Sequence, residues 1–325
     1  MVRPIGGSNT AFGSGAIGLS GKIGVANGIS LANNITLSGS AAQVFADTGN
    51  SGTFAGVISG AQPLSKAGAG TLTLSGASTY SGSTSVTAGT LAVTGSIVNT
   101  STLTVASGGT LTGSGTVGTV ATAGTVTVQS GGTLAPGVNG PGTLTLNQGL
   151  TVASGGTLAM QLNGATAGTG FDQLVVKGAV SLTGASLTTS LGYSPGGGDS
   201  FTLIDNDGTD AVVGTFSGLA EGATINLGGT NYIISYVGGT GNDVVVSFPP
   251  NAVPTLVSFA AAVATASEDT QKEITLTNLA AQGNEADSDG TVTGFVVQAV
   301  STGTLKIGTS AVAATAWDAN TNNTA

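Results

Sequence analysis

The sequence predicts an all-β protein whose main part is a parallel β-solenoid. The octamer TVASGGTL occurs at Thr104–Leu111 and Thr151–Leu158, and the related TVQSGGTL lies between them at Thr127–Leu134. Their starts are 23 and 24 residues apart, and self-similarity at about 20 residues is typical of solenoids. Apolar and polar residues alternate with period two, as in Thr71–Leu74, which favours strands over helices. Residues 81–170 contain no aromatic side chain, which favours a narrow core of stacked aliphatic rows.

The composition agrees with many short strands joined by tight turns. The 325 residues include 56 glycines, and 40% of the residues are hydrophobic, whereas only 6% are charged and 4% aromatic. Disordered chains combine low hydrophobicity with high charge, so this chain is expected to fold. A single strand–turn–strand unit cannot bury its apolar face, so neighbouring units must stack. Five leucines are predicted to point into the core, with threonines facing outward: Leu72, Leu91, Leu111, Leu134 and Leu158.

The residue types that are missing exclude several classes of function. The chain has no cysteine and no histidine, which removes thiolate chemistry, the commonest general base and the commonest transition-metal ligand. No apolar run reaches the roughly 18–20 residues of a transmembrane helix. The net charge is +2 up to Phe171 and −11 from Asp172 onward. Nucleic-acid binding is not expected, because no basic stripe is available to neutralise phosphates.

One long motif points to a known family. Residues 64–93 read LSKAGAGTLTLSGASTYSGSTSVTAGTLAV. This segment resembles the autotransporter-associated β-strand repeat, with the pattern L-x-K-x-G-x-G-x-L-x-L-x-G-x-N-T-Y-x-G-x-T-x-(V/I)-x-x-G-x-L. Ser78 stands where the family has Asn. The fitting positions are Lys66, Gly68, Gly70, Leu72, Leu74, Gly76, Thr79, Tyr80, Gly82, Thr84, Val86, Gly89 and Leu91.

The resemblance extends over about Gly6–Phe248 and implies a right-handed parallel β-helix on a bacterial outer surface or in the extracellular medium. We expect β-helix repeats over residues 1–170. Acidic and aromatic residues return from Phe171, so residues 171–248 are expected to form the final coils and capping strands. The end of a solenoid needs such a cap because its last strands would otherwise expose unpaired backbone groups. Pro249–Pro254 has the composition of a linker.

Residues 255–325 resemble a cadherin-like, immunoglobulin-type repeat of bacterial surface proteins, which implies a β-sandwich. About 75 residues are present where such domains need about 100, so the sandwich is expected to be partial and the chain a fragment. In this family carboxylates at the domain start and in a D-x-D-G loop gather calcium. The resemblance therefore implies calcium as a cofactor, at Glu268, Asp269, Asp287 and Asp289, with Glu285 close by. The alternative is a solvated acidic turn.

Two further acidic turns are not expected to bind calcium. The run Asp205–Asp210 begins like an EF-hand loop, but Phe216 stands where the twelfth-position Glu is required. Gly241–Asp243 occurs once, although the calcium nonapeptide that it resembles works in repeated copies. Both are interpreted as turns.

The sequence therefore predicts a non-catalytic stalk or adhesin segment, with cell-surface, matrix or polysaccharide ligands as candidate partners. Residues up to Gly170 offer one acid and three bases, whereas polysaccharide-processing β-helices need clustered carboxylates, or calcium with a basic residue. Two alternatives stay open: a β-helix polysaccharide lyase or hydrolase, and a truncated fragment without an independent function.

Overall fold

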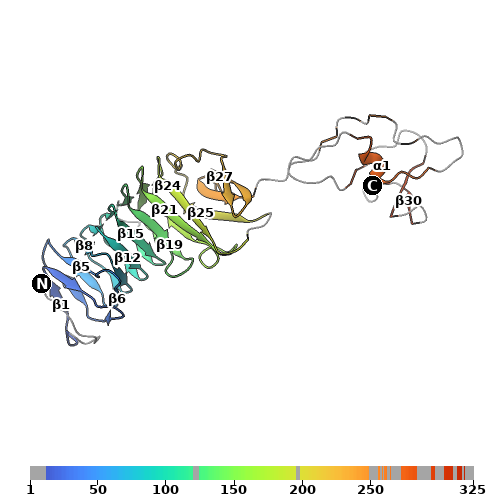
Figure 1. The fold of residues 1–325 in the computed structure, drawn as a ribbon. Coiled ribbons are helices and arrows are strands. Elements are labelled where there is room, and N and C mark those ends of the chain that lie inside the picture. The colour runs from blue at the N-terminus through green and yellow to red at the C-terminus, as the bar shows by residue number, and fades with distance from the viewer. Residues whose placement is uncertain are drawn as a thin grey trace. The chain divides into compact units, whose positions relative to one another are not determined.

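The structure is a computed structural model. It describes residues 12–119, 124–194 and 198–248, and beyond them residues 255–256, 258, 260–261, 264, 272–283, 294–296, 304–309, 313–316 and 318. The chain divides into two compact units, residues 1–249 and residues 250–325. The first unit contains the parallel solenoid (Figure 1). None of the helices in the described segments is long and apolar enough to span a membrane.

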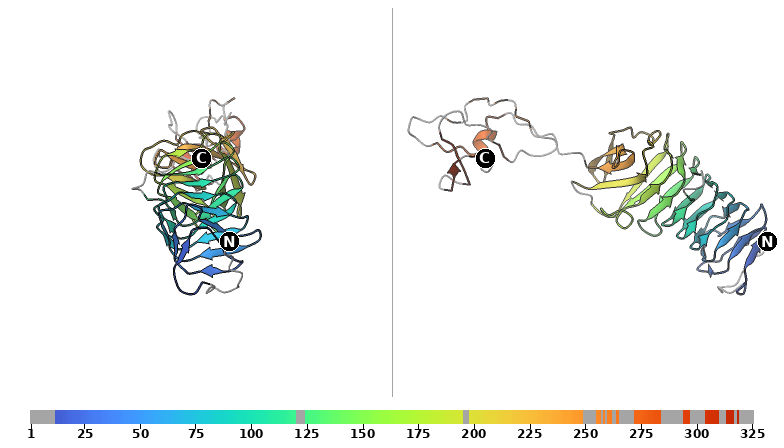
Figure 2. Two further views of the ribbon diagram at one scale, coloured as in Figure 1. Left: turned by 90° about the vertical axis from the view of Figure 1, so that its left-hand side faces the viewer. Right: turned by 180° about the vertical axis from the view of Figure 1, so that it is seen from behind.

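Each coil of the solenoid contributes one strand to each of three sides, and the coils stack along one axis (Figures 1 and 2). On two sides the described strands form 8-stranded parallel sheets, so the coil is repeated 8 times. The predicted parallel β-helix is confirmed. The handedness that the resemblance implies stays a prediction.

We name each sheet by its terminal strands. The β2–β23 sheet contains β2 (Lys22–Gly24), β5 (Gln43–Phe45), β8 (Leu64–Ala67), β11 (Thr84–Val86), β14 (Leu103–Val105), β17 (Thr125–Val128), β20 (Gly149–Val152) and β23 (Val180–Ser181). The β3–β24 sheet contains β3 (Ser30–Leu31), β6 (Ser51–Phe54), β9 (Thr71–Leu74), β12 (Gly89–Val93), β15 (Gly109–Gly113), β18 (Thr133–Pro136), β21 (Thr157–Leu162) and β24 (Ser186–Leu191).

The third side starts with a 3-stranded sheet of β1 (Ile17–Leu19), β4 (Ile35–Leu37) and β7 (Ile58–Gly60). It continues as the β10–β26 sheet, which contains β10 (Ala77–Ser78), β13 (Ser96–Ile97), β16 (Thr116–Val117), β19 (Thr143–Leu146), β22 (Gln173–Val176), β25 (Ser200–Asn206), β28 (Asp243–Ser247), β27 (Thr230–Gly238) and β26 (Thr224–Leu227).

The core is a set of aliphatic rows that run along the stack. Leu111 pairs in register with Leu91 on one side and with Leu134 on the other. The row predicted from the repeats, from Leu72 to Leu158, is continuous, and each of its five leucines is 0% exposed. Burying one such side chain contributes about 1.5–3 kcal/mol, so the stack is held mainly by apolar burial between coils.

The outer surface of the same strands carries hydroxyl side chains. One row on the β3–β24 sheet is formed entirely by threonine and serine in consecutive register: Ser51, Thr71, Thr90, Thr110, Thr133, Thr157 and Ser186. Branched, hydrogen-bonding side chains suit such cross-strand positions. The alternation of the sequence is therefore explained by leucine facing inward and threonine facing outward.

Glycine allows the sharp corners between the sheets. Gly89 has a φ of +63°, and a Cβ atom on it would lie 2.4 Å from the carbonyl oxygen of Gly68 in the preceding coil. Any other residue would therefore clash as well as adopt an unfavourable conformation. The glycines of the 64–93 motif are required by the close approach of successive corners.

Coil length increases from the coil of the 64–93 motif to the C-terminal end of the stack. Leu72 and Leu91 lie opposite each other and are 19 residues apart in the sequence, whereas Leu158 and Leu187 are 29 apart. The strands keep their register because the additional residues lie in the connections, such as residues 163–172 between β21 and β22. Insertions in such surface connections cost little free energy.

Antiparallel strands close the C-terminal end of the solenoid, as predicted. Strand β25 pairs in parallel with β22 but antiparallel with β28, and β27 and β26 continue the sheet. Aromatic rings pack beneath these strands, with centroid distances of 5.3 Å between Phe171 and Phe201 and 5.9 Å between Phe201 and Tyr232. Bulky rings fill the end of a core that the aliphatic rows leave open.

The second unit is described only in part. Its described residues include a five-residue helix, α1 (Leu276–Ala280), with a capping box between Thr275 and Asn278. They also include an antiparallel pair, β29 (Lys306–Ile307) with β30 (Thr315–Ala316). The partial β-sandwich expected for residues 255–325 stays a prediction.

The stacking account predicts unequal effects for neighbouring substitutions on β15. Leu111→Ala removes a fully buried side chain and is expected to lower the free energy of unfolding by about 2–5 kcal/mol. Thr110→Ala, on the outward side, is expected to lower it by less than about 1 kcal/mol. Urea unfolding of both variants measures the difference, and equal losses would contradict the assigned orientation of the strand.

Candidate functional site

The residues expected to bind calcium lie outside the described part of the chain. This applies to Glu268, Asp269, Asp287 and Asp289, and to the neighbouring Glu285. Within the segments that are described, no three acidic residues come close enough to hold a metal ion. The calcium site therefore stays a prediction.

The two acidic turns near the end of the solenoid lie side by side and fasten the cap. Asp243 Oδ1 accepts a hydrogen bond of 2.9 Å from the backbone N–H of Asn206, and its Oδ2 accepts one of 2.9 Å from Thr240. Asn206 and Asn242 both donate to the carbonyl oxygen of Asp210, at 2.8 and 3.1 Å. Asp243 uses its oxygens within the protein, so this cluster joins β25 to β28. Both turns are predicted from the sequence, which does not indicate that they meet.

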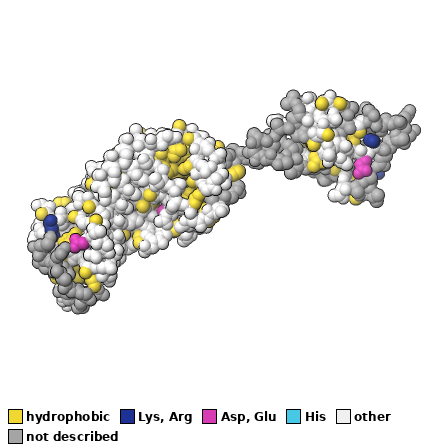
Figure 3. All heavy atoms as spheres, in the orientation of Figure 1, with side chains coloured by type: hydrophobic (Ala, Val, Ile, Leu, Met, Phe, Trp, Pro, Cys, Tyr) yellow, Lys and Arg dark blue, Asp and Glu magenta, His cyan; other side chains and the backbone are white. Residues whose placement is uncertain are grey.

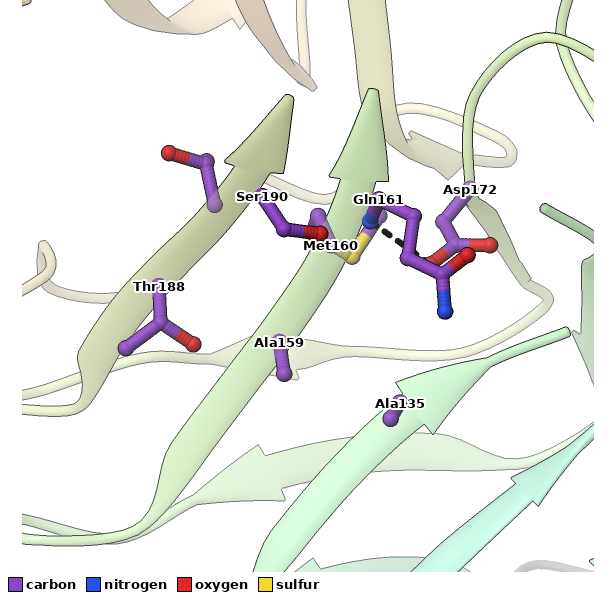
Figure 4. Close-up of a pocket in the computed structure, with 8 residues that line it drawn as sticks. Ala135, Ala159, Met160, Gln161, Asp172, Thr188 and Ser190 are labelled. Atoms are coloured by element: carbon purple, nitrogen blue, oxygen red, sulfur yellow. Dashed lines mark hydrogen bonds between the residues drawn. The ribbon is translucent and has the colours of Figure 1, made fainter. Parts of the chain in front are cut away.

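A hollow of about 290 Å³ lies on the outer face of the β3–β24 sheet near its last strands. In Figure 4, Thr188 and Ser190 come from β24, Gln161 and Ala159 from β21, and Ala135 from β18. The small alanines leave the space, and the hydroxyl and amide groups give it a polar rim.

Asp172 also lines this hollow, and no motif in the sequence singles it out. Its side chain is buried, and its two oxygens accept backbone hydrogen bonds of 2.9 Å from Gly142 and 2.8 Å from Gln161. It therefore joins the connection before β19 to the end of β21, in neighbouring coils. Burial raises the pKa of Asp172 from 3.8 to about 6, although both hydrogen bonds oppose the rise.

A carboxyl group with this pKa is able to exchange a proton near neutrality, but Asp172 acts alone. Hydrolysis of a glycosidic bond by the usual mechanism needs two carboxyl groups, one on each side of the bond. Among the residues that line the hollow, Asp172 is the one acid. One signal in the sequence marks it, since it is the first acidic residue after Asp47.

Three polar residues of the 64–93 motif, Lys66, Tyr80 and Thr84, are buried inside the solenoid. Lys66 is 0% exposed, and its Nζ donates to the carbonyl oxygens of Ala67, Gly68 and Ala88 at 3.1, 2.8 and 3.0 Å. These bonds satisfy all three donors of the ammonium group and join two successive corners. Burial lowers the pKa of Lys66 from 10.5 to about 8. Lys66 therefore stabilises the solenoid from inside by linking the backbones of two neighbouring coils.

A buried chain of hydroxyl groups occupies another corner of the same coil. The Tyr80 hydroxyl lies 2.7 Å from Thr84 Oγ1, which lies 3.0 Å from Thr100 Oγ1. Thr100 in turn donates to the carbonyl oxygen of Gly82 at 2.9 Å. Tyr80 is fully buried, as expected for a residue that packs at a coil corner. None of these motif residues forms a surface site.

Comparison with known families agrees with this geometry. Residues 64–93 and 138–160 match the model of the passenger-associated-transport-repeat. The first match begins with β8 and ends with β12, so it spans more than one complete coil. The second covers β19, β20 and part of β21. No curated protein matches the chain. The passenger-type β-helix interpretation is thus supported, whereas the cadherin-like resemblance is not tested.

The raised pKa of Asp172 predicts a pH dependence that a neutral variant should lose. Between pH 3.8 and about 6 the folded state holds the proton more tightly than the unfolded chain. The stabilising contribution of Asp172 is therefore fully present below pH 3.8 and is lost as the pH rises through about 6. Urea unfolding across this range should show a steeper decline for the natural chain than for Asp172→Asn. Parallel profiles would contradict the raised pKa.

Lys66 predicts the opposite trend at alkaline pH. Between about 8 and 10.5 the unfolded chain holds the proton more tightly, so stability should rise with pH in this window. The contribution is fully present above pH 10.5 and is lost as the pH falls through about 8. Lys66→Met should remove this rise, whereas Lys22→Met, at an exposed position on β2, should keep it. A rise that persists in Lys66→Met would contradict the assignment.

Proposed function

We propose that this chain is a non-catalytic segment of a surface-displayed or secreted passenger, and that its solenoid acts as a stalk. The observation that carries the proposal is the family match of residues 64–93, which begins and ends with strands of the solenoid and contains a complete coil. As its name says, the passenger-associated-transport-repeat is associated with passengers and their transport. A bacterial outer surface or the extracellular medium is the corresponding location.

The construction of the solenoid suits a stalk. Each coil is tied to the next by backbone hydrogen bonds on three sides and by a continuous apolar core. Such a stack transmits force along its axis because every coil contacts both neighbours. The buried ties of Lys66, Asp172 and Asp243 are all made within the chain. The described solenoid therefore derives its stability from its own residues.

The outer face supports a structural role more than a catalytic one. Most of the solenoid surface seen in Figure 3 belongs to uncharged polar side chains and backbone, with few charged groups. On the β3–β24 sheet the outward rows of the central coils carry threonine and alanine. Cell-surface, matrix or polysaccharide ligands remain the proposed partners, and they would be held by these uncharged faces or by the second unit.

The rival function is that of a polysaccharide lyase or hydrolase, and the hollow beside Asp172 is where it would be sought. The hollow combines a polar rim with a carboxyl group, that of Asp172, whose pKa is raised by burial. The lack of a second carboxylate in that lining favours binding over cleavage. A third alternative, a fragment without an independent role, predicts that the chain has no ligand and no cooperative unfolding.

Surface display is tested by labelling intact cells. A peptide epitope inserted between Val138 and Asn139, in an exposed turn, should be bound by antibody on intact cells that express the gene with its natural flanking sequence. An epitope that becomes accessible only after the cells are permeabilised would contradict the proposal. A cytoplasmic protein carrying the same epitope serves as the control.

The rival is tested by incubating the purified chain with pectin, alginate and related polysaccharides. No release of reducing ends and no ultraviolet absorbance of unsaturated products are expected. Cleavage that is lost in Asp172→Asn would contradict the proposed stalk function and would indicate an enzyme that uses this hollow. Thr133→Ala, on the outer face of the same sheet, is the matched control for a change that leaves the hollow intact.

A further inference from the structure

The three sides of the solenoid end differently at the cap. The β2–β23 sheet is extended by Val213, which exchanges backbone hydrogen bonds of 2.8 Å with Val180 and Leu182. The β10–β26 sheet continues through the antiparallel strands of the cap. The β3–β24 sheet stops at β24, and no described strand pairs with the outer side of β24. Just before this strand, the backbone N–H of Ser217 donates to the carbonyl oxygen of Ala185 at 2.7 Å, so the cap reaches the start of the edge. Within the part of the chain that the structure describes, the edge of β24 beyond that point is open.

The hydrogen bonds between β24 and β21 show which backbone groups of β24 are left to point to the open edge. Ser186 donates to the carbonyl oxygen of Gly156 at 2.8 Å, and Gly192 donates to that of Leu162 at 2.9 Å. The backbone N–H and C=O groups of successive residues point to opposite sides of a strand, so those of the even-numbered residues of β24 point to β21. The N–H and C=O groups of Leu187, Thr189 and Leu191 consequently point to the open edge. No hydrogen bond joins them to any part of the chain that the structure describes.

Burial shows that the edge is also incompletely covered on its apolar side. On β21 the inward residues Leu158, Met160 and Leu162 are at most 1% exposed. Their register partners on β24, listed in the same order, are Leu187, Thr189 and Leu191, and all three are partly exposed. The cap therefore covers the last strand less completely than β24 covers β21.

Strand β24 lacks the features by which proteins usually protect such an edge. Its six residues, SLTTSL, include no charged residue and no proline, and its pairing with β21 has no bulge. Exposed edges without these features favour pairing with a strand of another chain. The edge thus has both unpaired hydrogen-bonding groups and partly exposed leucines, which an added strand would satisfy together.

We propose that this edge is an interface with a second copy of the chain, formed by antiparallel pairing of the two β24 strands about Thr189. The sequence of β24 is self-complementary in this register. Leu187 of each copy would face Leu191 of the other, with Thr189 facing Thr189 between them. On the outer surface Thr188 would face Ser190 of the other copy. No apolar side chain would oppose a charge.

The hydrogen-bond pattern fits the same register. Antiparallel pairing exchanges bonds between residues whose N–H and C=O groups face each other. With Thr189 at the centre, the opposed pairs Thr189–Thr189 and Leu187–Leu191 all have groups that point to the edge. Every open group of both strands is then bonded. A two-fold arrangement uses the same patch on both copies and closes at two.

The interface is small, so the dimer should be weak in dilute solution. Stable complexes bury about 1,200–2,000 Å² in total, and a pair of six-residue strands buries less. Attachment of many copies to one surface would raise their effective concentration and favour pairing. The inference itself rests on the geometry of β24 and does not depend on the proposed function.

The test uses the full 325-residue chain in sedimentation velocity over a range of concentrations. The natural chain should show a monomer–dimer equilibrium. Thr188→Lys with Ser190→Lys places like charges opposite each other and should weaken the dimer by at least about tenfold. The matched control, Thr110→Lys with Thr157→Lys, adds the same charge to outward positions of inner strands and should dimerise like the natural chain.

Mixing charge-reversed variants tests the pairing itself. Thr188→Glu with Ser190→Glu should be monomeric alone but should form a mixed dimer with the lysine variant, because each lysine then faces a glutamate. A monomer at all concentrations, a dimer that the lysine pair leaves unchanged, or assemblies that grow beyond two copies would each overturn the proposal.

Disulfide formation fixes the register. The chain has no cysteine, and opposed residues in such a pair have Cα atoms about 4.5–5.5 Å apart, within the range that a disulfide spans. A mixture of Thr188→Cys and Ser190→Cys chains should form a mixed disulfide dimer on oxidation. If Thr188→Cys chains alone cross-link more efficiently than the mixture, the two strands pair about Thr188. That result would overturn the proposed register.

Discussion

The fold depends on the in-register stacking of aliphatic side chains between coils. A single coil has three short strands and no core of its own, so Leu111 is buried only because Leu91 and Leu134 lie against it. This constraint explains the glycine corners, because successive connections must approach closely enough for the rows to touch. It also explains why the outer positions are free to carry threonine and serine, which contribute little to the core.

A stack of this kind has its weak points at the corners and at the ends, and the buried polar residues lie there. In the part of the solenoid that matches the transport repeat, Lys66 joins two successive corners, and the hydroxyl chain that starts at Tyr80 reaches the next coil through Thr84 and Thr100. Asp172 fastens the coils next to the cap, and Asp243 fastens the cap itself. Each of these groups is buried with its hydrogen bonds made to the backbone or to a hydroxyl, which limits the cost of burying it. The open edge of β24 is the place where this closure stops.

The sequence predicts the central coils well because repeats of 23 and 24 residues bring equivalent leucines into register. It does not predict the contacts of Asp172, since the connection between β21 and β22 lengthens the coil and spacing no longer shows which residues are opposed. The hydrogen bond between Asn206 and Asp243 is not predicted from the sequence either, because it depends on the antiparallel pairing of β25 with β28 in the cap. The motif around Lys66 indicates the fold, whereas the inward direction of its polar residues becomes evident only when burial is known.

Distances between spin labels along one outer row test the stacking most directly. Labels on Thr71→Cys with Thr157→Cys would be separated by four strand spacings, which corresponds to about 19 Å between Cα atoms. Labels on Ser51→Cys with Ser186→Cys would be separated by six spacings, or about 29 Å. The account predicts narrow distributions whose separation grows in proportion to the number of coils. Broad distributions, or a separation that does not grow from the first pair to the second, would contradict it.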